Sequence, residues 1–185
     1  MGRTANGRHT WYLEAAVIAL NCGSGQRPFD RTQGWVNIDI NLRWEPDLIA
    51  DCNHLTMYED AHVDMVVSHH CLEHVGCGEA DGFIREAWRV LKPEGSLIVA
   101  VPNMRKLATL WLSGELTTQI YMTNVYGAYM GHEEDRHKWG FDPLSLEGQL
   151  KVAPWRMVAP FDWRHIPGAD IANDPRWILC LEAVK

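Results

Sequence analysis

The stretch Val17-Ile-Ala-Leu-Asn-Cys-Gly-Ser-Gly25 joins a short apolar run to a glycine-rich turn. The run over residues 17–20 predicts a buried strand, because its apolar side chains stop abruptly at turn-forming residues. Glycines in the turn let backbone amides approach a ligand closely, at the start of a following helix whose dipole favours negative charge. Any strand-to-helix turn favours glycine, so the interpretation of this turn depends on the segments that follow it.

Further segments of strand length follow, and most of them are strongly apolar: residues 35–40, 47–50, 63–67, 97–101 and 177–184. Residues 79–91 carry apolar side chains at helical spacing, and Lys92-Pro-Glu-Gly95 ends the helix. Residues 142–150 are predicted to form a short helix, which Asp142 caps ahead of Pro143. This alternation predicts an α/β fold. We expect a Rossmann-like, doubly wound, mostly parallel sheet of seven strands or slightly fewer, with helices on both faces.

The length of 185 residues fits a single domain that spans residues 1–185. Residues 103–138, called the insertion below, differ from the rest by their mixed polarity and their tyrosines and methionines. We interpret the insertion as a substrate-side segment or lid. Its aromatic side chains fit the lining of an acceptor pocket, and they fit equally well the core of a small lid.

The composition limits which binding partners and which cellular compartment we expect for this chain. The net charge is −7 and no run of Lys and Arg occurs, so we expect no nucleic-acid partner. No stretch reaches the ~18 apolar residues that a membrane span needs, and the first residues lack a signal-peptide core. The five cysteines form no CxxC pair, which is typical of reduced thiols in a cytoplasmic protein.

Two carboxylates follow predicted strands. Asp39 ends the second strand and Asp51 closes the third, and ligands of open α/β sheets lie at these carboxyl ends. Asp39 at that place can accept hydrogen bonds from both hydroxyls of a ribose, each contributing roughly 1.5–3 kcal/mol. Asp51 can accept one from an adenine amino group. The alternative for both residues is a carboxylate that caps a turn.

The chain resembles the class I S-adenosylmethionine-dependent methyltransferases, in particular the small-molecule branch similar to type 11. The resemblance is carried by six segments in the order and spacing of that family: Leu20-Asn-Cys-Gly-Ser-Gly25, Val36-Asn-Ile-Asp39, Asp47-Leu-Ile-Ala-Asp51, Val63-Asp-Met-Val-Val-Ser68, Leu72-Glu-His-Val75 and Arg89-Val-Leu-Lys-Pro-Glu-Gly95. It is strong over residues 13–102 and looser over residues 103–185.

The resemblance implies four groups of contacts to the cofactor S-adenosylmethionine: Asn21, Cys22, Gly23 and Gly25 to its methionine end, Asp39 and Ile40 to its ribose, Asp51, Cys52 and Asn53 to its adenine, and Ser68 and His69 to its sulfonium. One position departs from the family. Many members carry an acidic residue two positions before the first glycine, whereas Ala19 and Asn21 stand in this region here. The amino group of the cofactor therefore has fewer partners.

The resemblance implies an enzyme that transfers a methyl group to a small-molecule or sugar-linked acceptor, and we favour oxygen as the accepting atom. A hydroxyl acceptor must lose a proton, and histidine is suited to take it near neutral pH. His137, in the insertion, and His69, past the fourth strand, are the candidate catalytic residues. The alternative is a non-catalytic relative that keeps the fold to bind a partner. A nicotinamide-dependent oxidoreductase fits poorly, because Pro28 stands where its third glycine belongs.

His70, Glu73 and His74 have the spacing of one helical face. Ubiquinone-pathway O-methyltransferases resemble this stretch, and they use two acidic residues and a histidine there to hold a metal. Here the first of those acids is His70, so the pattern is imperfect. We therefore expect no metal.

Overall fold

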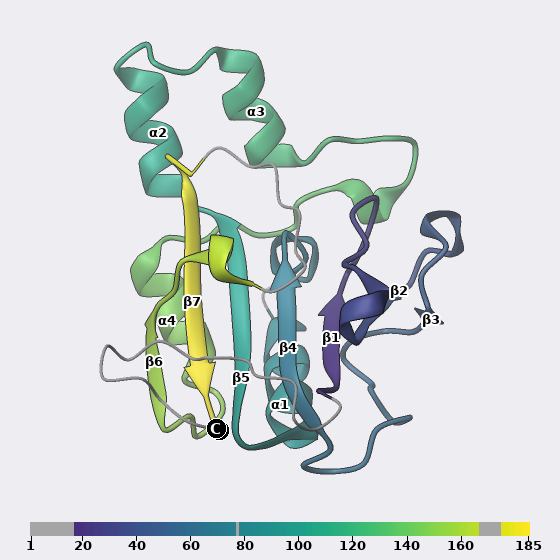
Figure 1. Cartoon of the computed structure of the whole chain (residues 1–185). Helices are drawn as coiled ribbons and strands as arrows, with labels where there is room; N and C mark the ends of the chain where they lie inside the picture. Colours follow the sequence, from purple (N-terminus) through teal and green to yellow (C-terminus); the bar gives the residue numbers. More distant parts are fainter. Residues whose placement is uncertain (1–16, 77, 167–174) are drawn as a thin grey trace.

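The computed structural model describes residues 17–76, 78–166 and 175–185. Its centre is a seven-stranded sheet in the order β3-β2-β1-β4-β5-β7-β6 (Figure 1). The strands are β1 (Ala19–Cys22), β2 (Trp35–Asp39), β3 (Leu48–Ile49), β4 (Val63–His69), β5 (Leu91–Pro102), β6 (Met157–Pro160) and β7 (Ile178–Val184). The strands from β3 to β5 pair in parallel, and β7 is antiparallel to both β5 and β6. The expected mostly parallel α/β sheet is confirmed.

Two α-helices cover one face of this sheet. They are α1 (Ala80–Val90) and α4 (Pro143–Leu150). Phe83 and Ala87 of α1 and Leu146 of α4 belong to one buried cluster with apolar side chains of β1, β4 and β5. The expected cap of α4 is present, because the Asp142 carboxylate accepts a hydrogen bond of 2.9 Å from the Ser145 amide. Burial of this apolar stripe holds α1 on the sheet.

Aromatic side chains cover the opposite face in the part of the chain that the structure describes. Phe29 and Trp35 meet edge to face with ring centroids 4.8 Å apart. The short 3-10 helix η5 (Trp163–His165) adds Trp163, and Ile166 follows it into the same cluster. This face therefore carries 3-10 turns where the first face carries α-helices.

One expectation about the glycine turn is wrong. No α-helix follows the turn; the link to β2 contains the 3-10 helix η1 (Arg31–Gln33) within residues 23–34. The link is short, and Pro28 in its middle lacks the amide that a helix interior needs. A ligand at this turn therefore gains no stabilisation from a helix dipole.

The insertion contains more regular structure than its polarity suggests. It forms α2 (Met104–Leu112), α3 (Thr118–Tyr126) and the 3-10 helix η4 (Glu133–Asp135). Figure 1 shows α2 and α3 beyond the carboxyl end of β5, with the chain after α3 running across toward β1 and β2. Among the described residues, no helix has the length and apolar character to cross a bilayer. The four cysteines within them are free thiols.

Candidate active site

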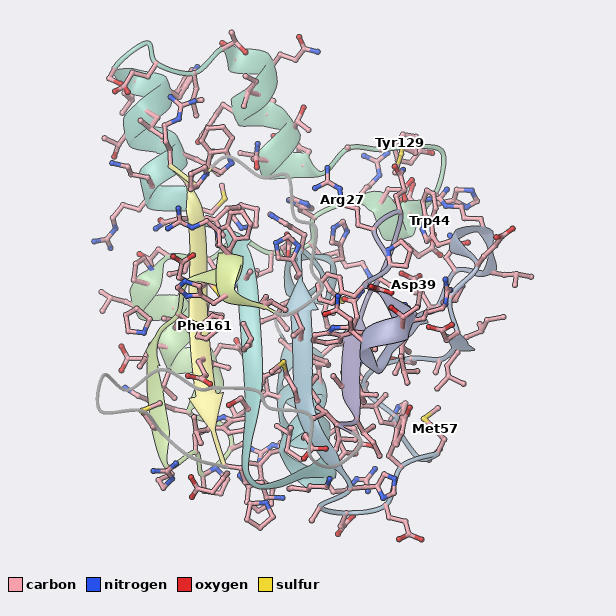
Figure 2. All side chains as sticks on the ribbon, viewed as in Figure 1. Arg27, Asp39, Trp44, Met57, Tyr129 and Phe161 are labelled. Atoms are coloured by element: carbon pink, nitrogen blue, oxygen red, sulfur yellow. The ribbon has the colours of Figure 1, made fainter. Side chains whose placement is uncertain are left out.

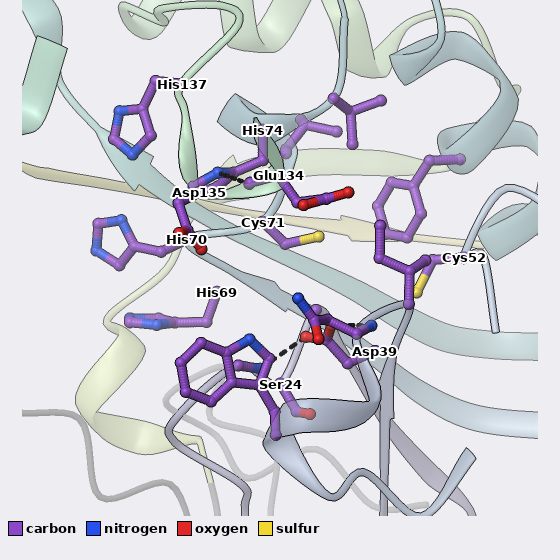
Figure 3. A pocket seen from close by; sticks show the side chains of 18 of the residues that line it. Ser24, Asp39, Cys52, His69, His70, Cys71, His74, Glu134, Asp135 and His137 are labelled. Atoms are coloured by element: carbon purple, nitrogen blue, oxygen red, sulfur yellow. Dashed lines mark hydrogen bonds between the residues drawn. The ribbon is translucent and has the colours of Figure 1, made fainter. Parts of the chain in front are cut away.

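A cavity of about 900 Å³ opens between the carboxyl ends of β1, β2 and β4 and the insertion. Its walls come from the glycine turn, the segments that follow β2, β3 and β4, and residues 123–138. Figure 3 shows the rings of His137, His70 and His69 along one side, with Ser24 and Asp39 on another. The volume is within the roughly 300–1,000 Å³ that small-molecule sites occupy.

The glycine turn is held tightly against its neighbours. Gly23 has a φ of +70°, and a side chain there would begin only 2.3 Å from Cys71 Sγ. The amides of Gly23 and Ser24 both donate to the Ile38 carbonyl, at 2.8 and 3.0 Å. Glycine is therefore required at position 23 for the backbone to reach the cavity wall.

Asp39 fixes the turn from the second strand. Its side chain is 8% exposed, and its two oxygens accept hydrogen bonds of 2.8 Å from the amides of Gly25 and Asn41. Each carboxylate oxygen has a second lone pair, so the group can still accept from a ligand. Asp51 is exposed and accepts bonds of 2.9 Å from the amide and the side chain of Asn53.

The histidines differ in their surroundings. Burial and the neighbouring His70 lower the pKa of His69 to about 3, so the His69 ring is uncharged at neutral pH. Burial also lowers the pKa of His137, although Glu73 acts to raise it. Nδ1 of His137 lies 2.9 Å from the Asn124 carbonyl, and Nδ1 of His74 lies 2.8 Å from the Glu134 carbonyl.

Glu73 lies beneath these rings and is 1% exposed. Its Oε1 pairs with His70 Nδ1 at 2.7 Å, whereas its Oε2 is buried without a hydrogen-bond partner. Burial acts to raise the pKa of Glu73, but His70, with smaller contributions from His74 and His137, lowers it to about 2. The carboxylate is therefore ionised.

The expected helical face of His70, Glu73 and His74 is only partly present. Leu72–His74 form a single 3-10 turn, η3, and His70 lies before it with a left-handed φ of 53°. The left-handed residue turns the chain sharply after β4, so no α-helix includes all three side chains. His70 and Glu73 still meet, but through their ion pair rather than through an α-helical repeat.

Comparison with known proteins identifies the fold and the family. Residues 5–99 match the model of a family described as a methyltransferase domain. The chain belongs to this methyltransferase family. It is a class I S-adenosylmethionine-dependent methyltransferase, as its sequence predicts, and its cofactor is S-adenosylmethionine. A search of curated proteins found no significant match.

Solved structures share the fold of this methyltransferase at low identity. A SAM-dependent methyltransferase from Archaeoglobus fulgidus is 14% identical, with a TM-score of 0.59 over 94% of this chain and 88% of its own. One from Methanosarcina mazei is 17% identical, with a TM-score of 0.54 over 94% and 92%. The 1,6-didemethyltoxoflavin-N1-methyltransferase of Burkholderia thailandensis is 16% identical, with a TM-score of 0.53 over 94% and 72%.

The residues present fit the cofactor of a methyltransferase. Ser24 Oγ and Asn53 Oδ1 are buried without a protein partner, and both residues line the cavity. Gly23 admits no side chain, and Asp39 retains acceptor capacity. A ligand with hydroxyl, amino and carboxylate groups would satisfy these atoms.

Most of the residues predicted to contact the cofactor of the methyltransferase line the cavity: Asn21, Gly23, Gly25, Asp39, Ile40, Asp51, Cys52, Asn53 and His69. His137, the predicted catalytic residue of the insertion, lines it as well. Cys22 and Ser68 do not. They pair across β1 and β4 and are fully buried, with Cys22 in the core cluster under α1. Because side chains alternate along a strand, these two point into the core rather than toward the cavity.

Sequence reasoning missed Trp44 and Asp135, which line the methyltransferase cavity, and Arg43, which contacts both. Arg43, which follows β2, forms an ion pair with Asp135 of the insertion, and its guanidinium lies 4.1 Å from the centre of the Trp44 ring. Asp135 also accepts bonds from the amides of Met130 and His132, at 2.8 and 3.2 Å. Figure 2 shows Trp44 and Tyr129 at the same corner of the molecule. Arg43 and Asp135 are far apart in the sequence, so no local sequence pattern predicts their contact.

Proposed function

We propose that this methyltransferase methylates an oxygen of a small-molecule or sugar-linked acceptor. The observation that carries the proposal is the arrangement of the cavity. The glycine turn and Asp39 form one part of its wall, His69 and His137 another, and residues of the insertion between 123 and 138 a third. A cavity of this size suits a small acceptor. The net charge of −7 also disfavours a nucleic acid.

The cofactor contacts follow from the positions in the wall. When bound, S-adenosylmethionine supplies a methyl group on a positively charged sulfur. Asp39 accepts hydrogen bonds from the ribose hydroxyls, and Asp51 and Asn53 contact the adenine. The glycine turn, beside Asn21, contacts the methionine end. Asn21 contributes little through its amide NH₂, which donates to Asn37 Oδ1 at 2.9 Å.

His137 is assigned to the acceptor side. Its Nδ1 faces the Asn124 carbonyl and must carry a hydrogen to bond with it, which leaves a lone pair on Nε2. That nitrogen can take the proton of an acceptor hydroxyl. His69, which is half-buried with its ring centroid 4.7 Å from that of His70, contributes a neutral wall near the methyl group. The insertion, whose residues between 123 and 138 line the cavity, acts as a lid over the acceptor.

The solved relatives support a small acceptor without deciding its chemistry. The 1,6-didemethyltoxoflavin-N1-methyltransferase of Burkholderia thailandensis was solved with 1,6-didemethyltoxoflavin and S-adenosylhomocysteine bound. Our preference for oxygen rests on the histidines of this chain, because a hydroxyl needs a proton acceptor.

Two measurements test the proposal. Calorimetry should show one S-adenosylmethionine bound per chain. The protein should then be incubated with methyl-labelled cofactor and a panel of hydroxylated metabolites and sugar conjugates, with their amine counterparts as controls. Label at oxygen supports the proposal. Absence of cofactor binding, or label only on the amines, contradicts it.

A further inference from the structure

Glu73, His74 and His137 converge beside the cavity. One ring nitrogen of each histidine and one carboxylate oxygen of Glu73 lie within 4.8 Å of one another. We propose that these three residues bind a divalent transition-metal cation that activates the acceptor hydroxyl. The inference rests on the proposed function and changes one assignment in it, because His137 then serves as a ligand instead of a base.

Hydrogen bonds to backbone carbonyls orient His74 and His137 as metal ligands. Nδ1 of His74 faces the Glu134 carbonyl at 2.8 Å, and Nδ1 of His137 faces the Asn124 carbonyl at 2.9 Å. A carbonyl only accepts, so each Nδ1 carries the hydrogen and each Nε2 keeps a free lone pair. Metal-binding histidines have this arrangement, in which a hydrogen bond from the second nitrogen fixes the tautomer and the ring orientation.

Glu73 supplies the negative charge of the proposed metal site. His70 binds Oε1 at 2.7 Å and thereby orients the carboxylate, while Oε2 is buried with no partner. An unpaired buried carboxylate oxygen is costly. A cation between Oε2 and the two imidazoles would satisfy that oxygen.

The fold keeps His137 next to Glu73 although they are distant in sequence. The Glu73 carbonyl accepts hydrogen bonds from the amides of Lys138 and Trp139, at 2.8 and 3.1 Å. The rings of His74 and His137 meet edge to face with centroids 4.6 Å apart. Gly127, with a φ of +83°, lets the chain pass so closely that a side chain there would begin 3.0 Å from the His137 amide.

The donor set indicates the kind of cation. Two imidazoles and one carboxylate, with coordination positions left open, are typical of catalytic Zn²⁺ and of non-haem Fe²⁺. Mg²⁺ prefers oxygen donors and is disfavoured. Ligand atoms at roughly 2.1 Å from a cation are closer together than 4.8 Å, so binding must draw the three side chains inward.

The proposed ligands Glu73, His74 and His137 differ from the three residues that the sequence spacing indicates, which are His70, Glu73 and His74. Because His70 stands where the metal-binding relatives have an acidic residue, we expected no metal from the sequence. In the structure His70 orients Glu73, and its place in the set is taken by His137 from the insertion. That expectation considered only residues that are close together in the sequence.

The open positions would bind the acceptor hydroxyl. A bound cation lowers the pKa of a coordinated hydroxyl, so the O–H bond breaks, the proton goes to water and the oxygen keeps the electron pair. That oxygen is then the nucleophile, and no side chain has to accept the proton.

Cobalt is a suitable probe, because Co²⁺ occupies such sites and its visible absorption reports the ligands. The chelator-treated full chain should be titrated with Co²⁺ alone, by calorimetry and by absorption. We expect one ion per chain, visible bands, and no intense near-ultraviolet band from thiolate. The variants are Glu73→Gln and His137→Ala, and the control is His62→Ala, an exposed histidine that precedes β4 at the opposite end of the strands.

Both site variants should weaken Co²⁺ binding by more than the roughly 10–100-fold lost when a residue that merely orients a ligand is removed. The control should bind as the unchanged protein does. Circular dichroism shows whether Glu73→Gln has folded, and the less buried His137→Ala provides the same test if it has not. Absence of binding, a thiolate band, or unchanged affinity in folded His137→Ala overturns the inference.

Cofactor titration of the same samples separates this inference from the proposed function. Bound S-adenosylmethionine without Co²⁺ overturns the metal site alone and restores His137 as the base. Bound Co²⁺ without S-adenosylmethionine contradicts the proposed function and leaves the metal site standing.

Discussion

Asp39 joins the glycine turn to the second strand through a nearly buried carboxylate. We predict that Asp39→Ala lowers the affinity for S-adenosylmethionine by at least about 10-fold, because a hydrogen bond to a charged group contributes roughly 1.5–3 kcal/mol. The Gly25 amide also loses its acceptor. Calorimetry measures the loss, and circular dichroism checks the fold.

Asp51→Ala provides the comparison for this prediction. Asp51 is exposed, so water can partly replace its contact and the affinity should fall less. If Asp39→Ala and the unchanged protein bind S-adenosylmethionine with equal affinity, the adenosine does not bind at this edge of the sheet.

His137 should matter for turnover and little for cofactor binding. We predict that His137→Ala lowers kcat on a hydroxyl acceptor by roughly 10²–10⁴, the range for loss of a group that assists proton removal. The residue lies in the wall that the insertion contributes to the cavity, whereas Asp39 and Asp51 follow β2 and β3. Steady-state kinetics combined with calorimetry separates the two effects. A fall in cofactor affinity instead would mean that the insertion closes over the cofactor.

The sequence identifies those site residues that strand ends bring together. Asp39, Asp51 and the glycine turn could be found in this way, because each follows an apolar run. Cys22 and Ser68, predicted in the same way, are buried and do not line the cavity, since the last residues of a strand alternate between the core and the edge. Arg43 and Asp135 carry no local signal, and only the tertiary fold brings them into contact.

Among the helices and strands, prediction succeeded where the apolar pattern is strong. The boundaries of β4 and α1 agree with the apolar pattern to within two residues. The helix α3 has no buried residue, so it lacks the apolar stripe that would predict it. The edge strand β6 is only partly buried and was also missed. The helix expected after the glycine turn is absent, because the link is short and contains Pro28.

Lys185 closes the carboxyl end of α1. Its Nζ donates to the carbonyls of Trp88 and Leu91, at 2.7 and 2.8 Å, and lies 4.0 Å from the centre of the Trp88 ring. We predict that Lys185→Ala lowers the free energy of unfolding by about 1 kcal/mol, because a cation at a helix end and over an aromatic ring is favourable. Denaturant melts measure the change. Lys185→Met keeps the aliphatic stem, and equal losses in both variants would assign the effect to the charge.

For the whole molecule, the ion pair of Arg43 and Asp135 ties the insertion to the sheet. We predict that Arg43→Ala raises KM for the acceptor several-fold while changing the free energy of unfolding by less than about 1 kcal/mol, because Asp135 keeps its backbone donors. Hydrogen exchange over residues 127–138 should accelerate. Arg156→Ala, which breaks an exposed ion pair with Glu94, is the matched control. It should change neither KM for the acceptor nor hydrogen exchange over residues 127–138. Unchanged exchange in Arg43→Ala would show that other contacts hold the insertion.

The place of β7 in the sheet has a consequence for how the chain is made. β7 follows β6 in the sequence but lies between β5 and β6. On the ribosome, the strands that carry the cofactor wall emerge before β6 and β7, so that half can begin to pair while synthesis continues. β6 has to wait for β7 before it can join the sheet. We therefore expect a nascent chain to leave the backbone N–H and C=O groups along one edge of β5 unpaired until residues 178–184 emerge, and that interval is when the chain is most exposed to aggregation and to chaperones.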